Sequence, residues 1–133
     1  MKDLAILLRA LQLLAHLNHN VVIGQTFFAD HAMLSELYTA YETAYDSVVE
    51  RMIGTSVLDP KQLLDIQQSA VDVVKSATLS TDATAIFKAL SHGEDELQRY
   101  CEAVKGSAGT LNLVQQLADD SEVRNYKLKQ RLK

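Results

Sequence analysis

The chain has 133 residues, 47% of them hydrophobic, and a formal net charge of −4 at pH 7. A single cysteine excludes an intrachain disulfide and a cysteine-rich zinc site. The acidic balance argues against a surface devoted as a whole to nucleic acid. The length predicts one domain over residues 1–133, and a leucine- and alanine-rich chain with one proline and five glycines favours an all-α fold.

The first predicted helix spans about residues 2–23 and ends near Gly24. Its apolar run from Leu4 to Leu17 is shorter than the ~20 residues of a membrane-spanning helix, and Arg9 and Gln12 interrupt it. No small-residue cleavage site follows it. We therefore expect a buried helix, no membrane partner and a cytoplasmic location. Because apolar residues occupy more than one face, we also expect this helix to contribute to a subunit interface.

The second predicted helix runs from Ala29 or Asp30, with Asp30 as its N-cap, to residue 53, and it stops at Gly54. Residues 54–60 form a predicted turn. Asp59 then caps a shorter helix over residues 60–76, whose first position is proline.

A polar stretch over residues 78–82 leads into a third long helix over about 82–105. A glycine-containing break over 106–110 precedes the last helix, which runs from about 111 to 131. Four long helices with a shorter one between the second and third predict an up-down bundle with one long connection.

Two of the four histidines, His19 and His31, flank the predicted break at Gly24. On one continuous helix they would lie about 18 Å apart, but a turn at Gly24 brings the two helix ends together. Asp46 and Glu50, spaced i, i+4, share one face of the second helix. Two imidazoles and two carboxylates are a suitable ligand set for Fe(II), Mn(II) or Zn(II).

The carboxylates cannot join both histidines within one chain, because His31 and Asp46 lie about 22 Å apart along the same helix. An antiparallel pairing of this helix with its own copy, centred near residue 39, places His31 opposite residue 47 of the second chain. Closed two-fold interfaces generate such sites in equivalent pairs. The sequence therefore permits a site between two chains, whereas the in-bundle di-iron signature Glu-x-x-His does not occur in it.

These residues resemble the motif of the Dps family, the mini-ferritins or DNA-binding proteins from starved cells. The family pattern is His-Trp-Asn-Val-x-Gly-x-x-Phe-x-x-x-His, followed after fifteen residues by Asp-x-x-x-Glu-Arg. Some members also carry a histidine three residues before the first ligand, as His16 does here. The matching residues in this chain are His19, Val22, Gly24, Phe27, Phe28, His31, Tyr38, Asp46, Glu50 and Arg51.

The resemblance implies a ferritin-like four-helix subunit, with an extra helix between the second and third, that forms two-fold dimers and a shell of twelve. It implies an oxidoreductase that oxidises Fe(II) with hydrogen peroxide or oxygen, stores the ferric product and protects DNA from oxidative damage. By the same resemblance, His19 and His31 of one chain and Asp46 and Glu50 of its partner are the metal ligands and catalytic residues. His16 is an auxiliary ligand candidate. Zinc or manganese are alternative ions.

Two departures from the family pattern motivate a second hypothesis. Asn20 stands where the family usually has tryptophan beside the metal site, and the chain lacks the lysine-rich N-terminal extension of many DNA-binding members. The alternative is therefore a non-enzymatic structural or DNA-associated helical oligomer with a degenerate metal site. A third hypothesis is a dimer that binds zinc or manganese without forming a shell.

The remaining polar clusters have simpler interpretations beside functional ones. His92 and the acids that follow it predict a solvated patch. Acidic residues of the last helix either line an iron-admitting pore, as in the family, or form a solvated face. The basic C-terminus either contacts DNA through many copies or complements the helix dipole. The acids of these clusters are Glu94, Asp95, Glu96, Asp119, Asp120 and Glu122, and the C-terminal cations are Arg124, Lys127, Lys129, Arg131 and Lys133.

Overall fold

The computed structural model describes residues 1–56, 58–77 and 79–133. Val57 and Thr78, which fall in the turns predicted at 54–60 and 78–82, lie outside the described residues. The described residues form five helices, which confirms the all-α prediction. The helices are α1 (Lys2–Val21), α2 (Phe27–Thr55), α3 (Pro60–Ser76), α4 (Ala83–Ala103) and α5 (Ala108–Arg131).

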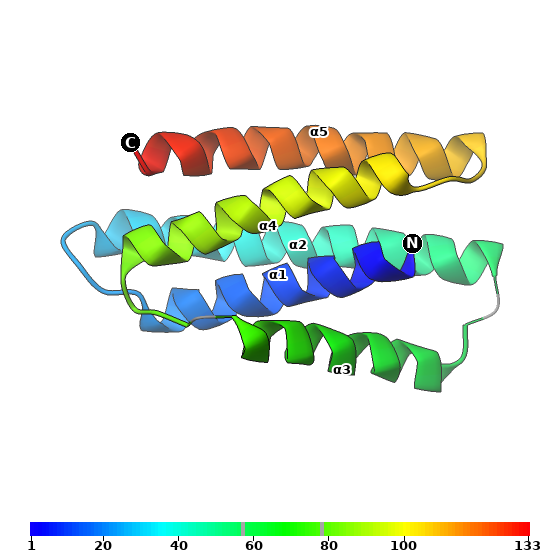
Figure 1. The fold of residues 1–133 in the computed structure, drawn as a ribbon, viewed down its shortest axis with the longest axis horizontal. Coiled ribbons are helices and arrows are strands. Elements are labelled where there is room, and N and C mark those ends of the chain that lie inside the picture. Colours follow the sequence, from blue (N-terminus) through cyan, green and yellow to red (C-terminus); the bar gives the residue numbers. More distant parts are fainter. Residues whose placement is uncertain (57, 78) are drawn as a thin grey trace.

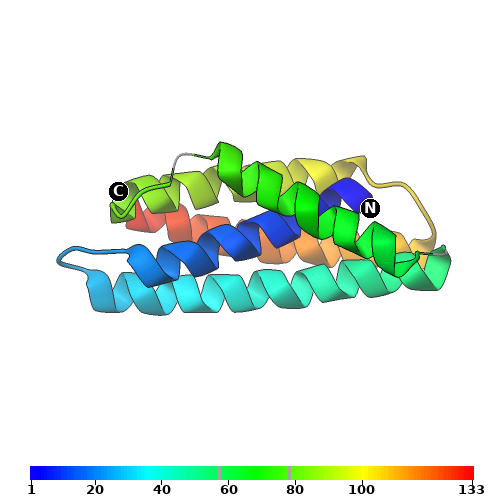
Figure 2. The same cartoon turned by 90° about the horizontal axis from the view of Figure 1, so that it is seen from below.

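Helices α1, α2, α4 and α5 run along the long axis of the molecule (Figure 1). Helix α3 lies on the outside, next to α1, and crosses it obliquely (Figure 2). Helix α1 packs against α2, α3 and α4, while α5 packs mainly against α4. Because α3 occupies the connection between α2 and α4, these two long helices point in the same direction along the axis.

Local capping signals explain why three of the helices begin where they do. Asp59 caps the helix that starts at Pro60, as the sequence predicts, and the structure adds that Gln62 completes a reciprocal capping box with it. The Asp82 side chain accepts a hydrogen bond from the backbone N–H of Ala85 at the start of α4. Ser107 caps α5 in the same way. Each cap satisfies backbone donors that have no partner inside the helix.

The prediction that Asp30 caps α2 is wrong. The helix begins at Phe27, with Thr26 in the capping position, so Asp30 lies inside the first turn and is buried. Its carboxylate accepts hydrogen bonds from Thr26 and, at 2.9 and 3.0 Å, from Arg131 at the end of α5. An aspartate near a helix start therefore serves here as a partner for a distant cation.

Helix α1 supplies the floor of the core. Leucines at four successive turns are buried, and alanines and a glutamine between them are buried as well; the buried residues are Leu4, Ala5, Leu8, Ala10, Leu11, Gln12, Leu14, Ala15 and Asn18. The face of α1 that looked free for another subunit packs partly against α3 of the same chain. Among the described residues, no helix has both the length and the hydrophobicity needed to span a bilayer.

The acidic run after His92 is not simply a solvated patch. Glu94 is completely buried. Its carboxylate accepts short hydrogen bonds of 2.6 Å from Tyr41 of α2 and from Ser121 of α5. Arg124 of α5 binds both carboxylate oxygens, at 2.6 and 3.1 Å. A buried charge is tolerated when it is paired and its hydrogen-bonding capacity is used, and here the two helices α2 and α5 supply the partners.

The pKa values around Glu94 follow from this arrangement. Burial, and then the charge of Glu94, raises the pKa of Tyr41 well above its usual 10.0, so the phenol stays a hydrogen-bond donor. Burial alone would lower the pKa of Arg124, but its hydrogen bonds with Glu94 and the opposite charge raise it. The phenol of Tyr41 therefore stays neutral and the guanidinium of Arg124 stays charged at ordinary pH.

We expect Glu94→Leu to destabilise the fold strongly, by about 3–5 kcal/mol, because it leaves Arg124 without its buried partner. The double variant Glu94→Leu/Arg124→Met removes both charges and should lose much less. Urea unfolding of both variants, with exposed Glu102→Leu of α4 as the matched control, measures this difference. Equal losses in the single and double variants would show that the ion pair is not what the core requires.

Candidate metal centre

A short loop between α1 and α2 reverses the chain beside the two histidines. Gly24 has φ 126°, a left-handed conformation that favours glycine, and the turn depends on it. The backbone N–H of Ile23 donates to the carbonyl of Thr81, 3.2 Å away, in the connection before α4. The loop is thus fastened to a distant segment, and the end of α1 meets the start of α2.

His19 and His31 lie face to face, as the break at Gly24 predicts. Their ring centroids are 3.7 Å apart and the rings are inclined by 24°. Nδ1 of His19 lies 3.0 Å from the carbonyl oxygen of His31, and Nδ1 of His31 lies 2.9 Å from the carbonyl oxygen of His19. Each histidine therefore holds the backbone of the other.

These two hydrogen bonds fix the tautomer of both rings. A carbonyl oxygen only accepts, so both Nδ1 atoms must carry the proton and donate. In the neutral imidazole the lone pair then resides on Nε2, which is the nitrogen that binds a metal when a carbonyl orients the other one. The pair His19–His31 therefore presents two pre-oriented nitrogen ligands.

Aromatic side chains surround the histidine pair. Phe27 stacks on His31 with centroids 5.0 Å apart. Tyr38 meets the His19 ring edge-on at 5.3 Å, and His16 stacks on Tyr38 at 4.2 Å. The His16 and His19 rings are 6.3 Å apart, so His16 reaches the pair mainly through Tyr38. Phe28, 87% exposed, extends the apolar rim outward.

The stacking restricts how the two rings could bind an ion. Imidazoles that share one ion radiate from it at metal–nitrogen distances of about 2.0–2.1 Å, which separates the ring centres. Rings held face to face at 3.7 Å suit that geometry poorly. His19 and His31 are better arranged to serve two adjacent ions, one each, than to grip a single ion together.

Asp46 and Glu50 lie elsewhere on the surface of α2. Both are exposed, and they follow His31 by 15 and 19 residues on the same helix, at least about 22 Å away. Within the described part of this one chain, no three histidine, cysteine or acidic side chains gather in a metal-binding arrangement. The structure brings the two histidines together and leaves the two carboxylates apart from them.

Cysteine does not complete the set either. Cys101 is buried in α4, and burial raises the pKa of its thiol to about 11. A thiol that stays protonated at neutral pH is a poor metal ligand and nucleophile.

The ion pair between Asp30 and Arg131 is a feature of this region that the sequence pattern did not reveal. It fixes the residue next to His31 to the end of α5. The hydrogen bond from Arg131 lowers the pKa of Asp30, against the opposing effect of burial. The sequence signal was only an aspartate in the first turn of a helix, and nothing local identifies a partner 101 residues away.

Ion pairs within the fold also engage part of the basic C-terminus. Arg124, Lys129 and Arg131 form ion pairs with Glu94, Asp95 and Asp30. Lys127 and Lys133 are the other two cations of this segment, and both are exposed. Three of the five C-terminal cations thus have carboxylate partners within the fold. The acidic side chains at 119, 120 and 122 are exposed on α5.

Comparison with known proteins adds no assignment. No family model, curated protein or solved structure matches the chain.

The reciprocal hydrogen bonds predict a difference between two substitutions of His31. Asparagine places an amide N–H near the position of Nδ1 and retains a donor to the carbonyl of His19, whereas alanine removes it. We expect His31→Ala to unfold about 1 kcal/mol more easily than His31→Asn, the net worth of one hydrogen bond. Thermal and urea unfolding measure this. Equal stability of the two variants would contradict a structural contribution of the Nδ1 bond.

Proposed function

We propose that the chain is a ferritin-like, Dps-like subunit that oxidises and stores iron at sites shared between two chains. His19 and His31 come from one chain and Asp46 and Glu50 from its partner. Fe(II) is the substrate and hydrogen peroxide or oxygen the oxidant. The proposed assembly is a two-fold dimer within a larger shell, and removal of Fe(II) and peroxide together would protect DNA.

The observation that carries the proposal is the His19–His31 pair with both Nδ1 protons engaged. A metal site requires nitrogen ligands oriented by backbone carbonyls, and the Nε2 atoms of both histidines have no hydrogen-bond partner among the described residues. The ligand set of one chain is incomplete, because its carboxylates lie about 22 Å or more away along α2. An antiparallel copy of α2 supplies them at the right level.

In the proposed reaction the main role of the protein is to position the iron ions. Two Fe(II) ions give one electron each to hydrogen peroxide, which yields two Fe(III) ions and two hydroxides. Neutral imidazole binds Fe(II), and carboxylates compensate the charge of the Fe(III) product. Acid weakens the site because the imidazoles must be neutral to bind. The aromatic residues around the pair keep its histidines in one orientation.

The first test is anaerobic addition of Fe(II) followed by hydrogen peroxide, recorded as the near-UV ferric absorbance. We expect a fast phase in the wild type and a loss of about 100-fold or more in both His31→Asn and His31→Ala, since even substitution of the groups that orient a ligand costs 10–100-fold. His92→Ala, a solvent-exposed histidine of α4, is the matched control. A fast phase that survives in both His31 variants would exclude the proposed site.

A mixing experiment tests whether the site is shared. His31→Ala and Asp46→Ala are each expected to be inactive. When the two are unfolded and refolded together, half of the dimers contain one chain of each kind, and every mixed dimer has one intact site. The mixture should recover about a quarter of the wild-type rate. Light scattering confirms that the mixture has the wild-type mass; recovery of no activity at that mass would contradict a site between chains.

A second candidate function is favoured by the same hydrogen bonds. His19 and His31 also join the end of α1 to the start of α2, so their arrangement suits a structural oligomer in which they serve as a clamp. That hypothesis predicts stability differences between the His31 variants and no fast oxidation in the wild type. The two tests above therefore separate the two functions.

A further inference from the structure

A cleft of about 410 Å³ lies between α1, α3 and α4, away from the histidine pair. Leu7, Leu11 and Leu14 of α1 form its floor, with Val74 of α3 and Ala89 of α4 on its sides. Its lining is overwhelmingly apolar, and its volume falls within the range of small-molecule sites. Water in such a space gains little from its walls, so an apolar solute displaces it favourably.

The cleft exists because α3 and α4 both pack on α1 but do not pack closely against each other. Both α3 and α4 pack on α1, while no extensive contact joins α3 to α4 in the described part of the chain. Small residues at the facing positions, Ala10, Ala77, Ala89 and Gly93, keep the space open. A Cβ at Gly93 would collide with the Leu11 side chain, so this glycine sets the close approach of α4 to α1.

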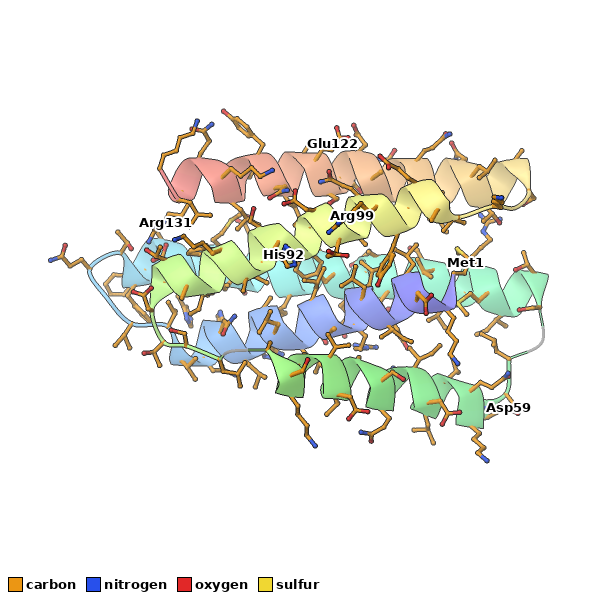
Figure 3. The ribbon with its side chains drawn as sticks, viewed as in Figure 1. Met1, Asp59, His92, Arg99, Glu122 and Arg131 are labelled. Carbon is orange, nitrogen blue, oxygen red and sulfur yellow. The ribbon has the colours of Figure 1, made fainter. Side chains whose placement is uncertain are left out.

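The contact between Gly93 and Leu11 also fixes the register of the two antiparallel helices. Asp3 lies eight residues before Leu11, and Tyr100 lies seven residues after Gly93, so both fall at the same end of the cleft, about 11 Å from its middle. Figure 3 shows Met1 and Arg99 displaced from His92 toward this end. Glu96 lines the same half.

At the opposite end, none of the described lining residues is charged. Val73, Val74 and Ala77 of α3 face Leu14 and Ala89 there. The cleft is therefore apolar at one end, and at the other it carries two carboxylates and a phenol. Glu96 is paired with Arg99 and lies 3.8 Å from His92. Asp3 forms no ion pair within the described residues, so its charge remains available to a ligand.

We propose that this cleft binds a small amphiphilic amine, with its hydrocarbon part against Leu14, Ala77 and Ala89 and its ammonium group beside Asp3 and Tyr100. The Asp3 carboxylate disfavours a fatty acid of the same length, because like charges would meet at the polar end. An ammonium group donates up to three hydrogen bonds, which the Asp3 carboxylate and the Tyr100 hydroxyl can accept, while Glu96 is already paired with Arg99. This proposal does not depend on the iron chemistry.

Calorimetric titration with octylamine, octanoate and 1-octanol at pH 7 tests the proposal, because the three probes share a chain length and differ in head group. We expect octylamine to bind at submillimolar concentration and octanoate at least about tenfold more weakly. Ala89→Leu fills the apolar end and should weaken octylamine at least about tenfold. Ala85→Leu, one turn earlier on the exposed face of α4, is the matched control and should bind as the wild type does.

A second variant keeps the test independent of cavity filling. Asp3 is exposed, so the variant Asp3→Asn leaves the core unchanged. It should weaken the binding of octylamine about two- to fivefold and leave the binding of 1-octanol unchanged. No binding of octylamine by the wild type, equal binding of octylamine and octanoate, or wild-type affinity in Ala89→Leu would each overturn the proposal. A change of mass in Ala89→Leu without octylamine binding to the wild type would assign the cleft to a subunit contact instead.

Discussion

The burial of α1 between α2, α3 and α4 is the constraint on which the rest of the molecule depends. A helix covered on three sides must be apolar on most of its circumference, and this explains a composition that otherwise suggests a membrane segment or an interface. The same burial fixes what α1 carries at its ends. His19 is held at the C-terminal end against α2, and Asp3 is held at the N-terminal end beside α4. Both candidate sites are consequences of one packed helix.

Helix positions could be predicted from the sequence because their signals are local. Apolar spacing and glycine-containing or polar breaks delimit the long helices, and Asp59 followed by Pro60 marks the start of α3 to the residue. The structural roles of Asp30 and Glu94 could not be predicted in this way. Both are acidic residues in helices, where exposure is the usual outcome, yet each is buried against an arginine of α5. Such partners are separated by 30 and 101 residues, and only the fold brings them together.

These two ion pairs also change the meaning of the charge pattern. The end of the C-terminal helix is a basic segment in an acidic protein, but Arg124 and Arg131 form ion pairs with carboxylates of the same chain. A guanidinium that neutralises a buried carboxylate leaves little charge for phosphate, and moving Arg124 would leave Glu94 buried without its partner at a cost on the order of 3–5 kcal/mol. Contact with DNA would rest on the exposed Lys127 and Lys133, which makes the proposed protection chemical more than physical.

One chain places only part of the candidate metal centre: it brings the two histidines together but leaves the two carboxylates far from them. The turn at Gly24 is local, so the meeting of His19 with His31 follows from a short stretch of sequence. The carboxylates are placed on the same rigid helix as His31, and a rigid helix of 29 residues cannot fold back on itself. Because the helix is rigid, Asp46 and Glu50 would meet a histidine pair only if that pair belongs to a second chain. Under the proposed function, such a subunit would bind iron well only after assembly, and free chains would carry the two histidines without the carboxylates that complete the proposed site.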